Sequence, residues 1–188
     1  MAIVYRATLR PTKLELIGRW LPAQPWYDGS ADQAPTALGA YRFDDPDGEV
    51  GLETHLLRVG DGPVLQVPLT YRSAALAGAD KALVGTMDHS VLGQRWVYDG
   101  CADPVYVAAL TAVLQRRAEQ AEELVDIDGH RERREPTVVV TATGGTAASG
   151  AGLRVSRIVD TGVRAGDAPC LVGTWEGQPE PTVLATVS

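Results

Sequence analysis

The sequence predicts an α+β fold, in which a curved antiparallel sheet is flanked by helices and followed by a small all-β C-terminal unit. Three observations predict it. Short apolar runs separated by turn residues fill most of the first 100 positions, two segments carry helix-capping signals, and the composition changes after Pro136 to Val-rich runs with Gly and Ala between them. The length of 188 residues fits one domain, or one domain plus a small appendix.

The first 30 residues predict a strand at 3–9, a helix and then a proline-fixed elbow. Thr12 and Glu15 have the capping-box spacing, in which each side chain satisfies a backbone N–H of the first turn. Apolar residues fall on one helical face, and Trp20 is expected to anchor that face to the sheet. Pro22 and Pro25 are expected to end the helix.

The next 70 residues predict an antiparallel meander with one covered face. The expected strands are 37–43, 49–59, 63–72, 82–87 and 92–100. Pro46 and Gly48 are placed for a type I turn after the first of them. In the third strand apolar residues alternate onto one face, whereas Pro68 points the other way and indicates an edge or a bulge.

A long second helix is predicted from Asp103 to Val125. Asp103 is a good N-cap and Pro104 a good first residue. Its apolar stripe is expected to pack across the sheet and consists of Tyr106, Leu110, Val113, Leu114, Ala121 and Leu124.

The remaining chain predicts a charged linker at 129–135 and a small β unit at 136–188, after a first domain at 1–128. The β unit is expected to hold four short strands. Its Gly-rich segment 144–152 predicts a β-hairpin loop; a kinase-type glycine loop over nucleotide phosphates is the alternative.

Charge and composition exclude several classes of partner. The formal net charge is -7, and an acidic chain repels phosphate backbones, so nucleic acid is not an expected partner. No basic tract favours an anionic membrane, and no apolar run is long enough to span a bilayer. The N-terminal segment lacks the features of a signal peptide. Cys101 and Cys170 are expected to be buried, reduced thiols, which favours a cytoplasmic location.

The sequence shows no catalytic or metal-binding motif. His55, His89 and His130 are too far apart in sequence to indicate a metal site, and the acidic segment 44–49 is better explained as a turn than as a calcium loop. His89 follows Asp88 between two strands, so it is either a turn histidine or the partner of a carboxylate. No metal and no cofactor are expected.

Aromatic residues with polar tips are the remaining candidates for a binding surface. Such rings stack on sugar faces, although packing in a core or interface is the simpler explanation. They are Trp20, Trp26, Tyr27, Trp96, Tyr98 and Trp175.

Several longer motifs resemble a known family. The segments "RATLRPTKLELIGRWLPAQPWYDG", "VPLTYR" and "VLGQRWVYDG" are similar to the N-terminal cap domain of actinobacterial maltokinases and of related glucosamine kinases. The resemblance covers about residues 1–125 and is strongest to stand-alone cap-domain proteins, some of them labelled glucan-branching proteins. It implies a cystatin-like cap. The "branching" label lacks support, because this chain is too short for a barrel with paired carboxylates.

The resemblance does not carry catalytic residues with it. The full kinases hold their catalytic and metal-binding residues in HGD and DFE-like motifs, and neither motif occurs in this sequence. The C-terminal strands resemble an N-lobe hairpin of those kinases, but Ala185 stands where that hairpin would carry lysine, and the chain's lysines, Lys13 and Lys81, lie in the cap. The chain is therefore expected not to be an enzyme.

The function expected is that of a non-catalytic accessory or interaction protein of bacterial sugar metabolism. The alternative is a kinase-related fragment that retains an ATP or sugar-phosphate pocket completed by a partner chain. Expected partners are a sugar-metabolism enzyme or a second copy of the chain, with carbohydrate as a further candidate. Trp26, Tyr27, Trp96 and Tyr98 are the predicted rim of that partner or sugar surface, because Trp and Tyr are enriched at interface cores.

Overall fold

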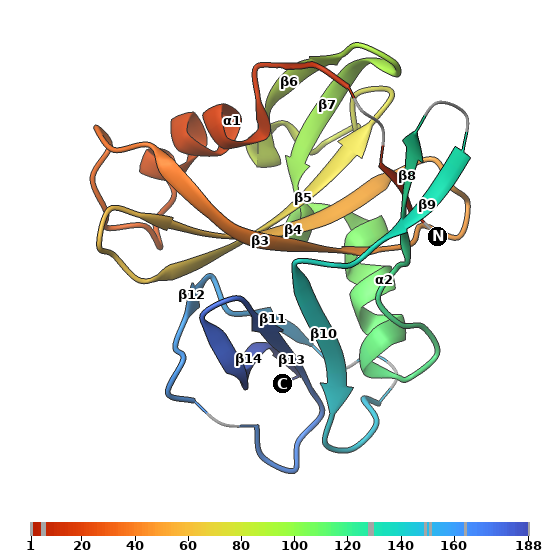
Figure 1. The fold of residues 1–188 in the computed structure, drawn as a ribbon. Coiled ribbons are helices and arrows are strands. Elements are labelled where there is room, and N and C mark those ends of the chain that lie inside the picture. The colour runs from red at the N-terminus through yellow and green to blue at the C-terminus, as the bar shows by residue number, and fades with distance from the viewer. Residues whose placement is uncertain are drawn as a thin grey trace.

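The computed structural model describes residues 2–4, 7–127, 130–148, 150, 152–163 and 165–187. These residues form three sheets and two α-helices, which confirms the predicted α+β class. Figure 1 shows the large sheet in the upper half of the molecule, with α1 above it and the C-terminal strands, in blue, below it.

Helix α1 (Lys13–Trp20) begins as predicted. The Thr12 side chain accepts the Glu15 N–H, and the Glu15 carboxylate accepts the Thr12 N–H at 2.7 Å, so both halves of the capping box are present. A 3-10 turn, η1 (Leu21–Ala23), follows directly. Trp20 and Leu21 are buried against the sheet, which confirms the predicted anchor. The strand predicted at 3–9 is wrong as one element, because β1 (Ala2–Val4) and β2 (Leu9–Arg10) belong to different sheets.

The large sheet has seven strands and curls into a half-barrel. Its main path runs in the order β2-β6-β7-β5-β4-β3. The bounds are β3 (Pro35–Phe43), β4 (Gly51–Val59), β5 (Val64–Arg72), β6 (Leu83–His89) and β7 (Gly93–Asp99). Two further 3-10 turns are η2 (Asp80–Ala82) and η3 (Gly100–Ala102). The turn after β3 forms as predicted, since the Gly48 N–H donates to the Asp45 carbonyl at 3.0 Å.

The pairing of strand β5 explains how it accommodates Pro68. One edge of β5 pairs with β4, whereas the other edge is shared by β7, which pairs from Leu69 onward, and by β12, which pairs at Val64 and Leu65. Pro68 has no N–H to donate, and it lies in the gap between those two neighbours. Pro68 therefore lies at an unpaired point on one side of β5, as it would in an edge strand, although β5 is a central strand.

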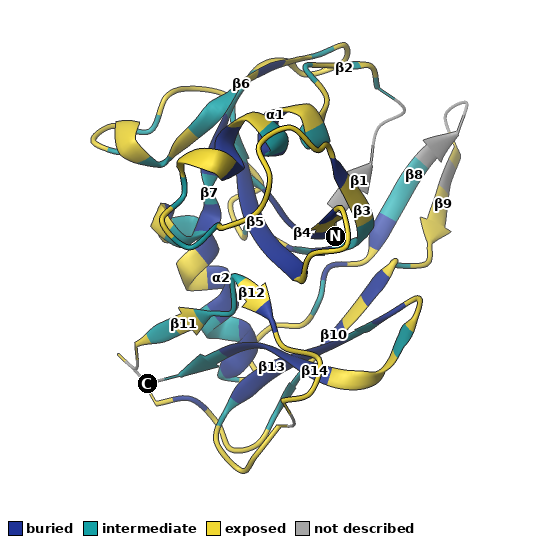
Figure 2. Cartoon of the chain, turned by 90° about the vertical axis from the view of Figure 1, so that its left-hand side faces the viewer, coloured by how far each residue is buried: buried dark blue, intermediate teal, exposed yellow. Residues whose placement is uncertain are grey.

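Both faces of the sheet are covered, so the prediction of one covered face is wrong. Alternate residues of β4 and β5 point to opposite faces. Leu57, Leu65 and Val67 pack with α1, whereas Leu56 and Val64 pack on the other face with α2 and the C-terminal strands. The two faces are called here the α1 face and the α2 face. Burial on both sides explains why β5 is almost continuously buried in Figure 2.

Helix α2 (Pro104–Leu114) begins as predicted but ends eleven residues earlier than expected. The Arg117 N–H donates to the Ala112 carbonyl at 2.8 Å and the Arg116 N–H to the Val113 carbonyl at 2.9 Å, which is a Schellman motif. Arg116 occupies its left-handed position with φ 55°, where glycine is usual. Of the predicted stripe, Ala121 is buried outside the helix and Leu124 lies in a strand.

The charged segment predicted as a linker contains a strand. Strands β8 (Glu123–Ile127) and β9 (His130–Arg134) pair antiparallel, and β1 adds to β8 in parallel. Residues 128 and 129 lie outside the described part of the chain. Charged side chains on the outer strand β9 suit a sheet edge, because charge opposes pairing with other chains.

The C-terminal unit contains a four-stranded sheet and one further strand that pairs with the large sheet. The four-stranded sheet consists of β10 (Val138–Thr143), β13 (Cys170–Trp175), β14 (Gln178–Val187) and β11 (Leu153–Val155), in that spatial order. Strand β12 (Ile158–Val159) pairs instead with β5. The Gly-rich segment joins β10 to β11 at opposite edges, so its prediction as a hairpin loop is wrong; residues 149 and 151 of it are not described.

One hydrophobic core, called here the shared core, joins the α2 face of the large sheet to the C-terminal strands. Members from both parts pack in it, among them Tyr41, Leu110, Leu171 and Leu184. Gln66 crosses it: its amide donates to the Leu184 carbonyl at 2.8 Å and to the Ser156 carbonyl at 3.1 Å. The proposed division into residues 1–128 and 136–188 stays a prediction, and this core crosses it.

Candidate functional site

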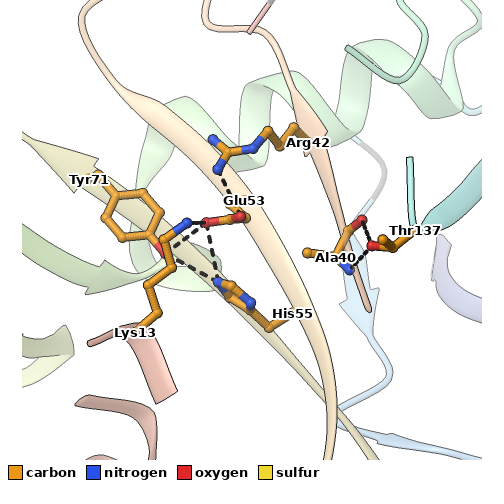
Figure 3. Close-up of polar contacts among 7 residues, drawn as sticks. All are labelled: Lys13, Ala40, Arg42, Glu53, His55, Tyr71 and Thr137. Carbon is orange, nitrogen blue, oxygen red and sulfur yellow. Dashed lines mark hydrogen bonds and ion pairs between the residues drawn. The ribbon is translucent and has the colours of Figure 1, made fainter. Parts of the chain in front are cut away.

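A cluster of charged side chains surrounds Glu53 on the α1 face (Figure 3). Its carboxylate accepts hydrogen bonds from Lys13 Nζ at 2.5 Å, Arg42 Nη2 at 2.8 Å and Tyr71 Oη at 3.0 Å. His55 Nε2 lies 3.3 Å from the same carboxylate and 3.2 Å from Tyr71 Oη. We call these five residues the Glu53 cluster.

Strand register brings the cluster together. Arg42 on β3 pairs with Glu53 on β4, and Gly51 of β4 pairs with Tyr71 of β5. Residues 53 and 55 share one face because side chains alternate along a strand. Lys13 is the first residue of α1, so the Thr12 cap that fixes the start of the helix also places this ammonium over the Tyr71 ring, 5.3 Å from its centre.

The cations decide the ionisation of Glu53. Burial alone would raise the pKa of this carboxyl, which is 6% exposed, but the charges of Arg42, His55 and Lys13 hold its pKa well below the usual value. Burial and the neighbouring Glu53 charge raise the pKa of Tyr71 well above its usual value. The cluster therefore holds a carboxylate and a neutral phenol, and Tyr71 acts as a hydrogen-bond donor rather than as a base.

A cavity of about 390 Å³ opens beside the cluster at one end of the half-barrel. We call it the mouth cavity. Its walls come from six strands or their turns and from α1, and the polar side chains among its lining are Lys13, Arg42, Asp44, Asp45, Glu49, Tyr71, His89 and Arg95. Apolar residues, including Leu52 and Met87, line the remainder.

His89 is a turn histidine, which is the first of the two roles considered from the sequence. Its Nδ1 accepts the N–H groups of Val91 at 3.2 Å and Leu92 at 3.1 Å, which fixes the β6–β7 turn. Burial, Arg95 and Lys13 lower the pKa of the ring. Because Nδ1 is an acceptor here, the neutral ring carries its proton on Nε2.

A second hollow, of about 780 Å³, lies along α2 and is called here the α2 groove. Ala108, Ala109 and Ala112 contribute to its floor. Acidic residues predominate among its charged lining, which consists of Asp44, Asp45, Asp47, Glu119, Glu122 and Arg117.

The four predicted rim residues do not gather on one surface. Trp26 and Tyr27 pack on the α1 side, where the Trp26 ring lies 5.9 Å from the Trp20 ring and Arg157 lies 5.4 Å from the Trp26 centre. Val97 of β7 packs on the α1 face, so its neighbours Trp96 and Tyr98 point to the other face. Tyr98 is 2% exposed and accepts the Leu76 N–H, so its ring is not available to a partner.

The cysteines are free, as expected, but only Cys170 is fully buried; Cys101 is partly exposed. Burial raises the pKa of the Cys101 thiol to about 11, so this group is a poor nucleophile. Within the described ranges, no three His, Cys, Asp or Glu side chains meet in a way that suits a metal ion. Neither of the α-helices described there has the length and apolar character needed to cross a bilayer.

Sequence reasoning missed the Glu53 cluster. The signal was a polar triplet, Glu53 to His55, inside a strand that was otherwise apolar. A glutamate in a central strand is rarely buried without a partner, so it indicated cations on the neighbouring strands.

The curled sheet, α1 and the closing helix α2 define a small α+β module, and part of this module matches a known family model. Residues 20–103 match the family model described as the maltokinase N-terminal cap domain. The resemblance inferred from the sequence motifs is thereby confirmed for this segment, which runs from the end of α1 to the N-cap of α2. None of the curated proteins matches the chain.

Proposed function

We propose that this chain is a non-catalytic accessory protein of bacterial carbohydrate metabolism that acts by contact with another protein. The match to the maltokinase cap domain supports the link to sugar metabolism. The proposal assigns no phosphoryl transfer to the chain.

The position of Ala185 carries the non-catalytic part of the proposal. In the resembling kinase hairpin this place belongs to a lysine that holds phosphate. Here Ala185 is 1% exposed and packs in the shared core with Leu184. A lysine in that place would bury a charge without a partner, which is costly. Strand β14 therefore closes the cap instead of presenting a phosphate-binding side chain.

The α2 groove is the contact surface that suits a partner protein. Its floor is alanine-rich, so the partner's backbone can approach closely, and its charged residues are mostly acidic. We assign to it a partner with a basic patch, because complementary charge raises the association rate and excludes partners of the same sign. The aromatic elbow at Trp26 and Tyr27 remains the second candidate surface.

A pull-down from an extract of the source cells tests the contact. Ala108 lies exposed in the groove, and Ala108→Arg places a bulky cation there. We expect this variant to lose a partner that wild type captures reproducibly, while Ala75→Arg, an equal change at an exposed position outside the groove, retains it. Capture of the same partner by both variants would reject the groove.

Incubation with ATP-Mg and a sugar panel tests the absence of catalysis. We expect no sugar phosphate above the level given by a mock purification. Phosphorylation that scales with the concentration of this protein would reject the proposal. Light scattering on the same samples shows whether the partner is a second copy of the chain.

A further inference from the structure

The mouth cavity lies where small-molecule sites are common. Open ends of β-barrels hold ligands because strands from all sides direct side chains toward one space. Here β2, β3, β4, β5, β6 and β7 or their turns all contribute to the lining, together with Lys13 of α1. The volume of about 390 Å³ is within the usual range for small ligands.

Cations from separate elements converge on this cavity. Lys13 comes from α1, Arg42 from β3 and Arg95 from β7. Glu53 neutralises one charge of the Lys13–Arg42 pair, but Arg95 makes no described ion pair with an acidic side chain. His89 lines the same cavity, and both Arg95 and Lys13 lower the pKa of its ring.

Arg95 also has an unmet hydrogen bond. Its Nη2 donates to the Leu92 carbonyl at 2.6 Å, which fixes the guanidinium against the β6–β7 turn. Its Nε is buried and has no acceptor among the described residues. A buried donor without an acceptor costs free energy, so an anion that reached it would bind with additional stabilisation.

The cavity is also lined by three acidic residues, Asp44, Asp45 and Glu49, which have other roles. Both oxygens of Asp45 accept backbone N–H groups of the turn, from Asp47, Glu49 and Val50. Asp44 and Glu49 are exposed. Carboxylates repel a phosphate and accept hydrogen bonds from hydroxyl groups, so they suit the hydroxyl end of a ligand rather than its charged end.

We propose that the mouth cavity binds a small phosphate ester that carries hydroxyl groups. Lys13 and Arg95 hold the phosphate, His89 lines the cavity beside them, and Glu49 accepts from the hydroxyls. Arg42 completes the cationic lining, and Glu53 keeps Lys13 in place. The cavity adjoins the α2 groove, with which it shares Phe43, Asp44 and Asp45, but Arg95 lines only the cavity and Ala108 only the groove, so the two proposals are tested by different residues.

Calorimetry with glucose 6-phosphate, inorganic phosphate and glucose tests the site. We expect glucose 6-phosphate to bind more tightly than inorganic phosphate and glucose not to bind. Arg95→Gln should weaken glucose 6-phosphate at least tenfold, whereas Arg58→Gln, the same charge change at an exposed position on β4, should not. Equal affinity in Arg95→Gln and wild type, or no binding of either phosphate at millimolar concentration, would overturn the proposal.

A spectroscopic readout places the ligand without any variant. Glucose 6-phosphate should shift the NMR signals of the His89 ring, and the ring of His130 on edge strand β9, a residue outside the cavity lining, serves as an internal control. Equal shifts of both rings, or a shift of neither at saturation, would place the phosphate elsewhere and overturn the site. The pull-down changes Ala108 of the groove and the calorimetry changes Arg95 of the cavity, so failure of one test is distinguishable from failure of the other.

Discussion

Gln66 and Glu53 lie on neighbouring central strands of one sheet, are both almost fully buried, and serve opposite purposes. Gln66 points to the α2 face, where its neutral amide meets neutral partners: the Tyr41 hydroxyl at 3.0 Å and two backbone carbonyls. Glu53 points to the α1 face and is held by two cations and a phenol. The surroundings of Gln66 are thus closed and neutral, whereas those of Glu53 are charged and lie beside an open cavity.

The difference follows from what covers each face. The C-terminal strands close the shared core completely, and a charge there would have no compensation from water. Beside Glu53, Lys13 is 26% exposed and reaches the mouth cavity, so solvent can stabilise part of the charge. Neutral hydrogen bonds therefore fix the closed core around Gln66, whereas the partly exposed surroundings of Glu53 tolerate ions.

The largest loss of stability is expected for a substitution of Glu53. In Glu53→Gln the charges of Lys13 and Arg42 lose their anion, and removal of one partner of a buried ion pair costs about 3–5 kcal/mol. Urea unfolding measures this loss. Glu176→Gln, an exposed change in the β13–β14 turn, should leave stability within about 0.5 kcal/mol of wild type. A loss below about 1 kcal/mol at Glu53 would show that solvent already screens the cluster.

Gln66→Leu is the corresponding substitution on the α2 face. Leucine fills a similar volume but leaves the Tyr41 hydroxyl and two carbonyls without this partner, at about 1–3 kcal/mol for an unsatisfied buried group. We expect a total loss of about 2–4 kcal/mol by the same principle. Hydrogen exchange should show faster exchange in β12 and β14 than in β6. Uniform acceleration across all strands would contradict a local role for Gln66.

Acid should sharpen the contrast between the two residues. The depressed pKa of Glu53 gives stability that is present above the ordinary value of 4.5 and is lost as pH falls through the lower, folded value. The stability difference between wild type and Glu53→Gln should therefore shrink progressively below pH 4.5. The cost of Gln66→Leu should not change over the same acid range, because burial raises the pKa of Tyr41, the titratable partner in that contact, far above it. Unfolding curves at pH 7, 5 and about 3 test both statements.

The smallest effect is expected at the end of α2. Arg116 adopts a left-handed conformation that costs an L-residue roughly 1–2 kcal/mol, so Arg116→Gly should gain up to about 1 kcal/mol. The exposed hydrogen bond from Arg116 to the Gly144 carbonyl offsets part of that gain. Gln115→Gly, one residue earlier, should instead destabilise. Thermal unfolding would contradict the assignment if both changes lowered the midpoint equally.

Local signals made much of the fold predictable. Thr12 with Glu15, and Asp103 with Pro104, fixed two helix starts correctly because capping depends on adjacent residues alone. The alternation of apolar residues in β5 correctly predicted which of its side chains share the α1 face. The end of α2 was missed because arginine stands where the Schellman motif usually has glycine, and the following segment keeps helical spacing.

Long-range pairing was not predictable from the same signals. Strand β12 pairs with β5 of the large sheet rather than with the other C-terminal strands. The segment that forms β9 is so highly charged that its sequence predicted a linker. The Glu53 cluster combines residues from α1, β3, β4 and β5, whose meeting depends on register. The aromatic rim failed as a single surface for the same reason, because one residue of offset places a side chain on the opposite face.

The shared core also has a consequence for synthesis on the ribosome. Gln66 and its acceptor Leu184 are 118 positions apart, so the α2 face of the sheet stays open until β14 has emerged. At a translation rate of about 5–20 residues per second, this apolar surface remains accessible to chaperones for several seconds. We expect nascent chains stopped before β14 to bind a chaperone such as trigger factor, and full-length chains to be released from it.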